Sequence, residues 1–256
     1  MTDFIYKSSL QPKLNILFYD IETFPNLGFI WGKWEQNVIE FKKDWVMCSF
    51  SYKWQGGKVR NCKLSDYPLY KKDTEDDREL VYDLYDLFLK ADIIIAHNGD
   101  AFDIKKTNTR FIQNGLKPPP PHKTIDTLKI ARKYFKFDSN KLNDLGQYLK
   151  LGEKVKTGGF DLWKGCMAGN KESWRLMGKY NNQDVELLEK VYNKLLPWIE
   201  NHPKKKLMLE RPNCDNCDSS KVWQKGYKMN LKGKRRQLHC QSCGHWFSGK
   251  QEKIDD

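Results

Sequence analysis

Two acidic residues close an apolar stretch near the start of the chain. The stretch NILFYDIETF (15–24) carries Asp20 and Glu22 two positions apart. In a β-strand alternate side chains share a face, so these carboxylates would lie about 6 to 7 Å apart. Like charges at that spacing repel unless a cation or hydrogen bonds balance them. The pair is consistent with a metal site, and equally with two solvated acids at the end of a strand.

Two later stretches supply further acids. The residues AHNGDAFD (96–103) follow a second apolar run, which places Asp103 at the carboxyl edge where open α/β sheets form their sites. In YNNQD (180–184), Tyr180 and Asp184 are four residues apart and share one helix face. We therefore expect four carboxylates and a phenol around one cavity.

The elements between these motifs change in type along the chain. Aromatic and β-branched runs predict an antiparallel meander over 27–34, 37–41, 45–54 and 58–64. Apolar periodicity predicts helices over 76–91, 102–116, 140–151 and about 172–199, a strand over 92–98, and a strand entering a helix over 123–135. This order predicts an α/β fold, a mixed sheet with helices on both faces.

The three acidic motifs also resemble those of a known superfamily. Asp20-Ile-Glu22, Asn98-x-x-x-Phe102-Asp103 and Tyr180-x-x-x-Asp184 are similar in order and spacing to the motifs of the DEDD 3′–5′ exonucleases, tyrosine branch, close to the proofreading domain of B-family DNA polymerases. The resemblance covers about residues 14–199. It implies a ribonuclease-H-like fold and the stepwise hydrolysis of DNA, releasing nucleoside 5′-monophosphates.

The resemblance implies a role for each motif residue. Asp20, Glu22 and Asp103 would surround the metal that prepares the attacking water, with Asp20 bridging to a second ion. Asp184 would complete the first site, and Tyr180 would position the water. Two divalent ions about 3.5 to 4 Å apart stabilise both reacting oxygens, and carboxylate ligands suit Mg²⁺ or Mn²⁺.

Three neighbouring residues have weaker assignments. The resemblance places Asn98 beside the bound nucleotide and packs Phe102 behind Asp103, although plain support of the loop explains both residues nearly as well. His97 is expected to be a structural group, because strand-end histidines usually have hydrogen-bond partners within the fold.

The C-terminal region carries a second candidate metal site. Cys214, Cys217, Cys240 and Cys243 form two Cys-x-x-Cys pairs separated by twenty-two residues. Four thiolates in this pattern predict one tetrahedral, structural Zn²⁺. His239 and His245 are close enough in sequence to replace a cysteine, but the intact pairs favour an all-cysteine shell.

The residues between the cysteine pairs predict a β-hairpin. The stretch 221–239 alternates apolar and polar residues, and with the closing CGHWF it resembles the zinc ribbon of some bacterial transposases. Basic and aromatic side chains in this stretch and the closing segment suit phosphates and stacked bases; they include Lys234, Arg235, Arg236, Trp223, Tyr227 and Trp246. Nucleic acid is the favoured partner of the ribbon, and a protein is the alternative.

Composition and charge agree with this organisation. The 256 residues carry a net charge of +12, which favours a polyanionic partner such as nucleic acid. Residues 201–256 hold thirteen Lys/Arg and six Asp/Glu, so this segment is disproportionately basic. We predict an exonuclease domain over 1–200, a linker over 201–212 and a zinc ribbon over 213–256.

Cellular context and partners follow as expectations. The absence of a long apolar segment, and the three cysteines scattered outside the C-terminal cluster, favour a reducing, cytoplasmic location in a bacterium or a phage-infected cell. No polymerase sequence follows the three motifs, so the expected partners are a separate DNA polymerase or a replication or recombination and repair protein, with no membrane association.

Two alternative functions remain open from the sequence. Carboxylates and metal ions do not distinguish ribose from deoxyribose, so a 3′–5′ exoribonuclease of the same superfamily is one alternative. The other is a non-catalytic nucleic-acid-binding protein that keeps the fold. The presence of all four acids and Tyr180 disfavours this second alternative.

Overall fold

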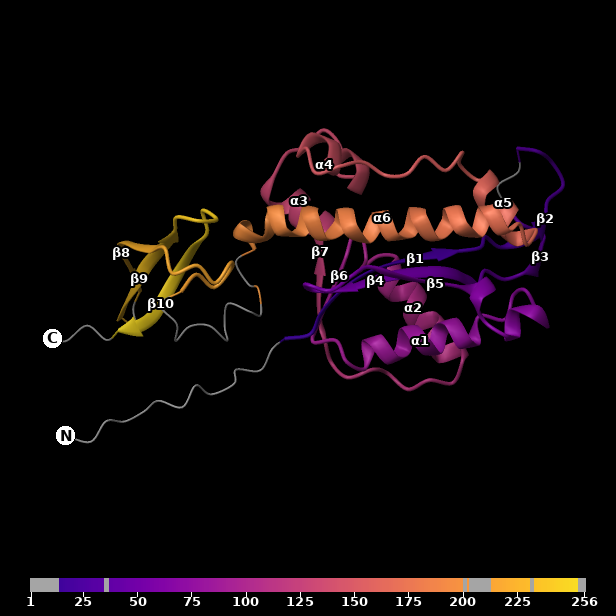
Figure 1. Cartoon of the computed structure of the whole chain (residues 1–256), viewed down its shortest axis with the longest axis horizontal. Helices are drawn as coiled ribbons and strands as arrows, with labels where there is room; N and C mark the ends of the chain where they lie inside the picture. Colours follow the sequence, from indigo (N-terminus) through magenta and orange to yellow (C-terminus); the bar gives the residue numbers. More distant parts are fainter. Residues whose placement is uncertain (1–13, 35–36, 200–201, 203–212, 231–232, 253–256) are drawn as a thin grey trace.

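The structure is a computed structural model that describes residues 14–34, 37–199, 202, 213–230 and 233–252 (Figure 1). Its centre is a five-stranded mixed sheet in the order β5-β4-β1-β6-β7. The strands are β1 (Ile16–Thr23), β4 (Met47–Trp54), β5 (Arg60–Lys63), β6 (Ile93–Ala96) and β7 (Lys123–Asp126). β1, β6 and β7 run parallel, and β4 is antiparallel to β1 and β5.

Helices cover both faces of this sheet, as the sequence predicted. The helices are α1 (Arg78–Phe88), α2 (Asp103–Gln113), α3 (Thr127–Tyr134), α4 (Leu142–Tyr148), α5 (Asp161–Met167) and α6 (Lys171–Leu195). Figure 1 shows α1 and α2 below the sheet and α3, α4 and α6 above it. Short 3₁₀ turns lie at Leu64–Asp66 (η1), Leu69–Lys71 (η2) and Leu196–Trp198 (η3).

Alternation along β1 decides which face receives the acids. Leu17, Tyr19 and Ile21 pack into the core beneath the sheet with α1 and α2. Ile16 and Phe18 point to the opposite face and pack against α6. Since side chains alternate, Asp20 and Glu22 continue the row of Ile16 and Phe18 on the α6 side.

The length of α6 brings its middle over the acidic end of β1. Near its beginning Trp174 and Met177 pack into one core, whereas Val185 and Leu188 pack into the other. The helix begins at a capping Asn170, whose side chain accepts the backbone N–H of Ser173 at 2.9 Å. Because both ends are packed, the polar residues near its middle are held facing the sheet.

A buried ion pair fixes the helix that carries Asp103. Arg110 of α2 pairs with Asp77, which precedes α1, and Asp77 is fully buried. The second oxygen of Asp77 accepts the backbone N–H of Met47 at 2.8 Å. This arrangement ties α1, α2 and the start of β4 together beneath the sheet.

Before α6, the structure departs from the predicted elements in two places. The predicted meander divides, because β2 (Leu27–Phe29) and β3 (Glu40–Lys43) form their own two-stranded sheet and only β4 and β5 join β1. Helix α5 was not predicted, because Gly158 and Gly159 before it dominate the local pattern as a loop signal. Both glycines adopt positive φ.

The C-terminal region is a small sheet in the order β10-β9-β8, one strand more than the predicted hairpin. Its strands are β8 (Val222–Asn230), β9 (Gly233–Cys240) and β10 (Trp246–Glu252). The predicted linker 201–212 lies outside the described residues except for His202, whose ring is buried and lies 2.7 Å from the hydroxyl of Tyr192.

Candidate active site

Three of the predicted acids meet between β1 and α6. Oxygen atoms of Asp20, Glu22 and Asp184 all lie within 4.8 Å of one another. Asp184 is almost fully buried, and none of the described residues forms a hydrogen bond with its Oδ1 atom. A buried carboxylate oxygen without a partner is unfavourable unless a cation or donor occupies the space beside it. These atoms could therefore hold a divalent metal.

The fourth acid lies beside this group. Asp103 is the first residue of α2 and is 3% exposed. Its Oδ1 atom accepts the backbone N–H of Ile21 at 3.2 Å, between Asp20 and Glu22 along β1. Asp103 does not belong to the tight group of three, but its charge raises the pKa of Asp20.

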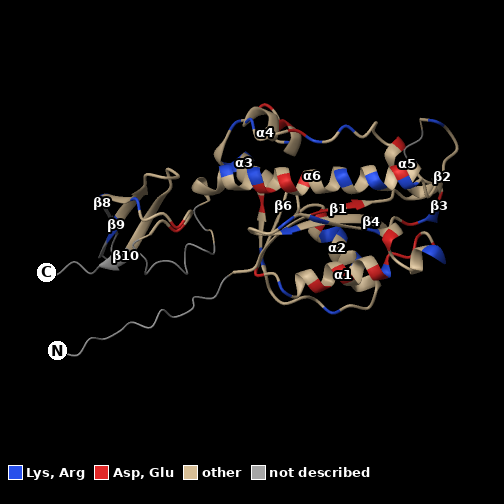
Figure 2. Ribbon diagram, viewed as in Figure 1, with Lys and Arg blue, Asp and Glu red and all other residues tan. Residues whose placement is uncertain are grey.

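Burial and neighbouring negative charges raise the pKa values of the acids in this site. Burial raises the pKa of Asp20 well above its ordinary value, and the neighbouring carboxylates raise it further. Burial likewise raises the pKa of Glu22 to about 8 and that of Asp103 to about 7. Figure 2 shows the red acidic segment of β1 beneath α6. Divalent cations would compensate this charge, so the donor set fits a hard metal ion.

One lysine that the sequence analysis missed reaches into the group. Lys154 Nζ lies 2.6 Å from Asp184 Oδ2, and its side chain is 29% exposed. Its ammonium group lowers the pKa of Glu22 and Asp20 and so offsets part of the negative charge. The residue lies in an irregular segment between α4 and α5 and has no motif around it, so no sequence signal identified it.

A buried amide holds Asp20 in place. Asn181, fully buried on α6, donates from Nδ2 to Asp20 Oδ2 at 2.6 Å and to the Asp20 backbone oxygen at 3.2 Å. Its own oxygen accepts the hydroxyl of Ser49 at 3.0 Å. Asn61 of β5 donates to Ser49 Oγ at 2.8 Å and to Ser51 Oγ at 2.9 Å. This network leaves Asp20 few orientations.

A glycine in α6 makes room for this network. A Cβ atom at Gly178 would lie 2.7 Å from Asn61 Oδ1 and so would displace the amide. Glycine inside a helix costs about 1 kcal/mol relative to alanine. The close approach of Asn61 explains its presence there.

Tyr180 precedes Asp184 by one turn of α6 and lies next to the acidic group. Burial raises the pKa of Tyr180, and the charge of Asp184 raises it further, so the phenol stays protonated and can donate a hydrogen bond. Its ring packs edge-on against Trp163 of α5, with centroids 6.1 Å apart. The tryptophan thereby restricts where the phenol points.

The turn before α2 is fixed by an aspartate that the sequence analysis did not single out. Asn98 is exposed and adopts a left-handed conformation with φ of 62°. Its backbone N–H donates to Asp126 Oδ1 at 2.9 Å, and the same oxygen accepts the N–H of Leu128 at 2.9 Å. Asp126 thus both supports the turn before α2 and caps the N-terminus of α3.

Phe102 and His97 have different surroundings. Phe102 is 40% exposed, and Lys106 Nζ lies 5.8 Å from the centroid of its ring. The residue precedes the first turn of α2, and its ring stays at the surface. His97 contacts Thr127 Oγ1 through Nδ1 and the Asn140 backbone oxygen through Nε2, both at 2.9 Å, which matches its expected structural role.

The four C-terminal cysteines form a separate cluster. Their sulfur atoms all lie within 4.8 Å of one another, with Cys214 and Cys243 at 3.7 Å and Cys217 and Cys240 at 3.6 Å. Zn–S bonds of about 2.3 Å in a tetrahedron place sulfur atoms about 3.8 Å apart. The cluster could therefore hold zinc.

Neither neighbouring histidine belongs to the cysteine cluster. His239 stacks on Trp246 and contacts Gln241. The buried His245 contacts the Pro197 backbone oxygen at 2.7 Å and lies 3.1 Å from Asp215. Of the basic residues expected to bind substrate, Arg235 and Arg236 lie on β9, away from the acidic group. The side chain of Lys234 is outside the described part of the chain.

The fold and site define an α/β protein with a carboxylate cluster at the carboxyl end of β1, the central strand of a mixed sheet. A family model described as the RNase H superfamily matches residues 35–196. The chain therefore belongs to the RNase H superfamily, which confirms the fold predicted from the motifs. No curated protein matches it.

Solved structures provide a second comparison. The family B DNA polymerase from the hyperthermophilic archaeon Pyrobaculum calidifontis is similar, with a TM-score of 0.55 and 13% sequence identity. The match covers 88% of this chain and 32% of the polymerase. At this identity the likeness concerns the fold alone.

Within the described residues, no helix combines the length and apolar character needed to cross a membrane.

Proposed function

We propose that this protein is a metal-dependent 3′–5′ exonuclease that hydrolyses DNA. The observation that carries the proposal is the convergence of Asp20, Glu22 and Asp184 within 4.8 Å, with Asp103 beside them. These acids come from three separate elements, β1, α2 and α6. Membership of the RNase H superfamily supports a nucleic-acid substrate, and the direction of digestion rests on the resemblance of the three motifs.

Each residue of the proposed active site has its own role in the hydrolysis. Asp20, Glu22, Asp103 and Asp184 would hold two Mg²⁺ or Mn²⁺ ions, which supply electrostatic stabilisation of the attacking and leaving oxygens. Tyr180 remains a phenol, so it orients the attacking water by hydrogen bonding rather than removing its proton. Asn181 holds the carboxylate of Asp20 in one orientation.

Lys154 contributes to the proposed hydrolysis by compensating negative charge. Its ammonium group balances part of the charge of the carboxylates and keeps Asp184 paired. With a phosphodiester in the site, a lysine beside the carboxylates would also reduce repulsion between the acids and the anionic substrate.

The cysteine cluster completes the proposal. One structural Zn²⁺ held by Cys214, Cys217, Cys240 and Cys243 would stabilise the three-stranded region. We further propose an exonuclease domain over 1–200, a linker over 201–212 and a zinc ribbon over 213–256 that binds nucleic acid. The basic strand β9 supports this binding role.

A gel assay tests the catalytic proposal. Purified protein with Mg²⁺ or Mn²⁺ should shorten a 5′-labelled single-stranded DNA in single-nucleotide steps, and matched RNA measures the sugar preference. Asp20→Ala and Asp184→Ala should each reduce the rate by at least 10³-fold, because each removes a ligand of the bound ions.

Asp86→Ala is the matched control. Asp86 is exposed on α1, on the opposite face of the sheet, so this variant should cleave at the wild-type rate. Wild-type rates in both Asp20→Ala and Asp184→Ala would refute the assignment of the acidic group. Release of a 3′-terminal label in the first cleavage, with the label of a 5′-labelled strand retained on the shortened products, would establish the 3′–5′ direction.

A further inference from the structure

We propose that a hollow beside the acidic group is a binding site for an unpaired nucleobase of the substrate strand. The hollow has a volume of about 530 Å³, within the range of small-ligand sites. It is lined mainly by apolar groups, among them Phe24, Leu27, Phe160 and Met167. The inference rests on the proposed nuclease function. It adds where the substrate strand lies and that the base in the hollow is unpaired.

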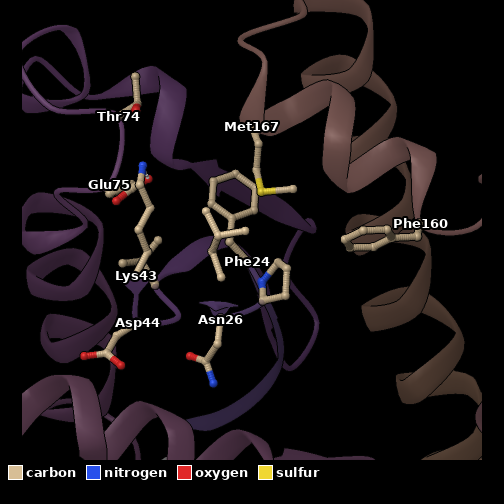
Figure 3. A pocket seen from close by; sticks show the side chains of 11 residues that line it. Phe24, Asn26, Lys43, Asp44, Thr74, Glu75, Phe160 and Met167 are labelled. Atoms are coloured by element: carbon tan, nitrogen blue, oxygen red, sulfur yellow. Dashed lines mark hydrogen bonds and ion pairs between the residues drawn. The ribbon is translucent and has the colours of Figure 1, made fainter. Parts of the chain in front are cut away.

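The walls of this hollow come from four separate segments, within residues 24–27, 43–46, 74–75 and 160–167. Figure 3 shows Phe24 and Met167 side by side, with Phe160 on one side and Lys43 and Glu75 on the other. Phe24 is 5% exposed, whereas Phe160 and Met167 are 52% and 42% exposed. A rigid buried ring and two accessible apolar side chains are thus presented to one open space.

A second hollow lies between this space and residues next to the proposed catalytic group. This hollow, of about 450 Å³, is lined by Thr23, Thr157, Gly159 and Trp163, and it shares the lining residues Pro25 and Phe160 with the first. Thr23 directly follows Glu22, and Trp163 packs on Tyr180 with ring centroids 6.1 Å apart. The two hollows therefore adjoin each other at Pro25 and Phe160, and the second is lined by immediate neighbours of Glu22 and Tyr180.

The chemistry of the lining favours bases over phosphates. Among the described lining residues, the single cationic side chain is Lys43, and it is paired with Glu75. Asp44 adds a carboxylate that would repel a phosphate. Neutral, flat and polarisable bases instead match the rings of Phe24 and Phe160, because every base has a face that stacks on an aromatic ring.

The exposed two-stranded sheet beyond the hollow points to the same ligand. Leu27 of β2 lines the hollow, and the turn after this strand displays Trp31 and Trp34, which are 85% and 83% exposed. Lys33 lies over the ring of Trp34 at 5.2 Å. Exposed aromatic rings interleaved with lysine are the side chains that bind single-stranded nucleic acid.

The experiment compares two substrates that differ in whether they can reach the hollow. One is single-stranded dT12, and the other is thymidine 5′-(p-nitrophenyl phosphate), which has one base and no upstream nucleotides. In Phe160→Ala, the ratio of kcat/KM for dT12 to that for the small ester should fall about ten-fold, the loss expected for one base–aromatic stack. Phe160→Tyr keeps the ring and should restore the ratio.

Ile112→Ala is the control for a general loss of exposed apolar surface. Ile112 is 76% exposed and lines a different hollow, at the proline-rich loop after α2, so this variant should keep the wild-type ratio. A ratio within two-fold of wild type in Phe160→Ala would overturn the inference and assign the hollow to another occupant.

A binding assay separates this inference from the proposed activity. If the wild-type protein hydrolyses neither substrate, the nuclease proposal fails, but fluorescence anisotropy with labelled dT6 still tests the hollow. The inference predicts weaker dT6 binding by about ten-fold in Phe160→Ala, and equal affinities would overturn it. A blunt duplex should bind the wild type more weakly than dT6, because a paired base cannot enter between the walls.

Discussion

The acidic group and the cysteine cluster are both built from four side chains, but the fold assembles them in opposite ways. Asp20 and its buried partner Asn181 lie 161 positions apart, one on the central strand β1 and the other on α6, the helix that covers it. Cys214 and Cys243 lie 29 positions apart, in one small sheet. The first site therefore depends on a preformed core, whereas the second supplies much of the core around it.

The two sites also differ in what happens to their charge. Carboxylates brought together by the fold repel one another. The ammonium group of Lys154 offsets part of this charge, and the pKa of Glu22 is raised. The scaffold must be stable enough to hold this repulsion. Thiols can instead stay neutral until a metal displaces their protons, so metal binding and folding are coupled. Loss of metal should consequently affect the two regions differently.

The largest effect should follow loss of a cysteine ligand. Cys240→Ser should abolish binding of one zinc ion and unfold the 213–256 region, because structural zinc contributes on the order of 10 kcal/mol to so small a core. Zinc content and limited proteolysis measure the result. Hydrolysis of thymidine 5′-(p-nitrophenyl phosphate) with Mn²⁺ should persist, because the acidic group lies in the other core.

Cys62→Ser is the matched control for this prediction. Cys62 lies on β5, outside the cluster, and the variant should keep one zinc ion and the wild-type proteolysis pattern. Equal zinc content in Cys240→Ser and the wild type would contradict the cluster as a metal site.

A smaller but still large effect should follow removal of the buried amide beside Asp20. Asn181→Ala removes the 2.6 Å hydrogen bond to Asp20 and leaves Ser49 without its acceptor. Hydrogen bonds to charged groups contribute about 1.5 to 3 kcal/mol, and loss of such a partner weakens metal binding about 10- to 100-fold. Thermal unfolding and Mn²⁺ titration by calorimetry measure the two effects.

Asn193→Ala serves as the control on the same helix. Asn193 is exposed, so its variant should match the wild type in both measurements. If Asn181→Ala lowered stability but left the affinity for Mn²⁺ unchanged, the amide would be a packing residue only.

The pH dependence of metal stabilisation sharpens the electrostatic side of the comparison. The pKa values of Glu22 and Asp103 are raised to about 8 and about 7 in the fold, from about 4 in an unfolded chain. The metal-free fold thus binds more protons than the unfolded chain between about pH 4 and pH 8, and its stability falls as pH rises through that window.

Added Mn²⁺ should therefore stabilise the protein more at pH 8 than at pH 5.5, because the ion binds the deprotonated carboxylates. Thermal melts with and without MnCl₂ at constant ionic strength measure this difference. Glu22→Gln removes one titrating group and should reduce the pH dependence. A metal-induced shift of equal size at both pH values would contradict the assignment of these acids as ligands.

The smallest effect concerns the glycine that accommodates the network. In the wild-type background, Gly178→Ala should be neutral or destabilising, because the new Cβ atom meets Asn61 Oδ1 at 2.7 Å. In an Asn61→Ala background the same change should stabilise by about 1 kcal/mol, the helix-propensity gain alone. Chemical denaturation of the four proteins gives this double-mutant cycle, and additive effects would contradict the close approach.

The sequence predicted the elements that carry the acidic motifs but missed a short helix and the division of the meander. The β1 and α6 motifs were found because period-2 and period-3.6 patterns place Asp20, Glu22, Tyr180 and Asp184 on definite faces. Helix α5 was missed because Gly158 and Gly159, directly before it, indicate a loop and obscure the short helical pattern that follows. The division of the meander was missed because short strands do not specify their partners.

The amino-acid sequence by itself determined the order of the elements, the acidic motifs and the cysteine pairs, since each depends on local spacing. Only the tertiary structure decided that Lys154 pairs with Asp184, that Asn181 and Asn61 orient Asp20, and that Thr23, the residue after Glu22, lines a hollow with Phe160 and Trp163. These contacts join residues distant in the chain, and a contact of that kind leaves no periodic pattern, because its geometry is set by the packing of whole elements.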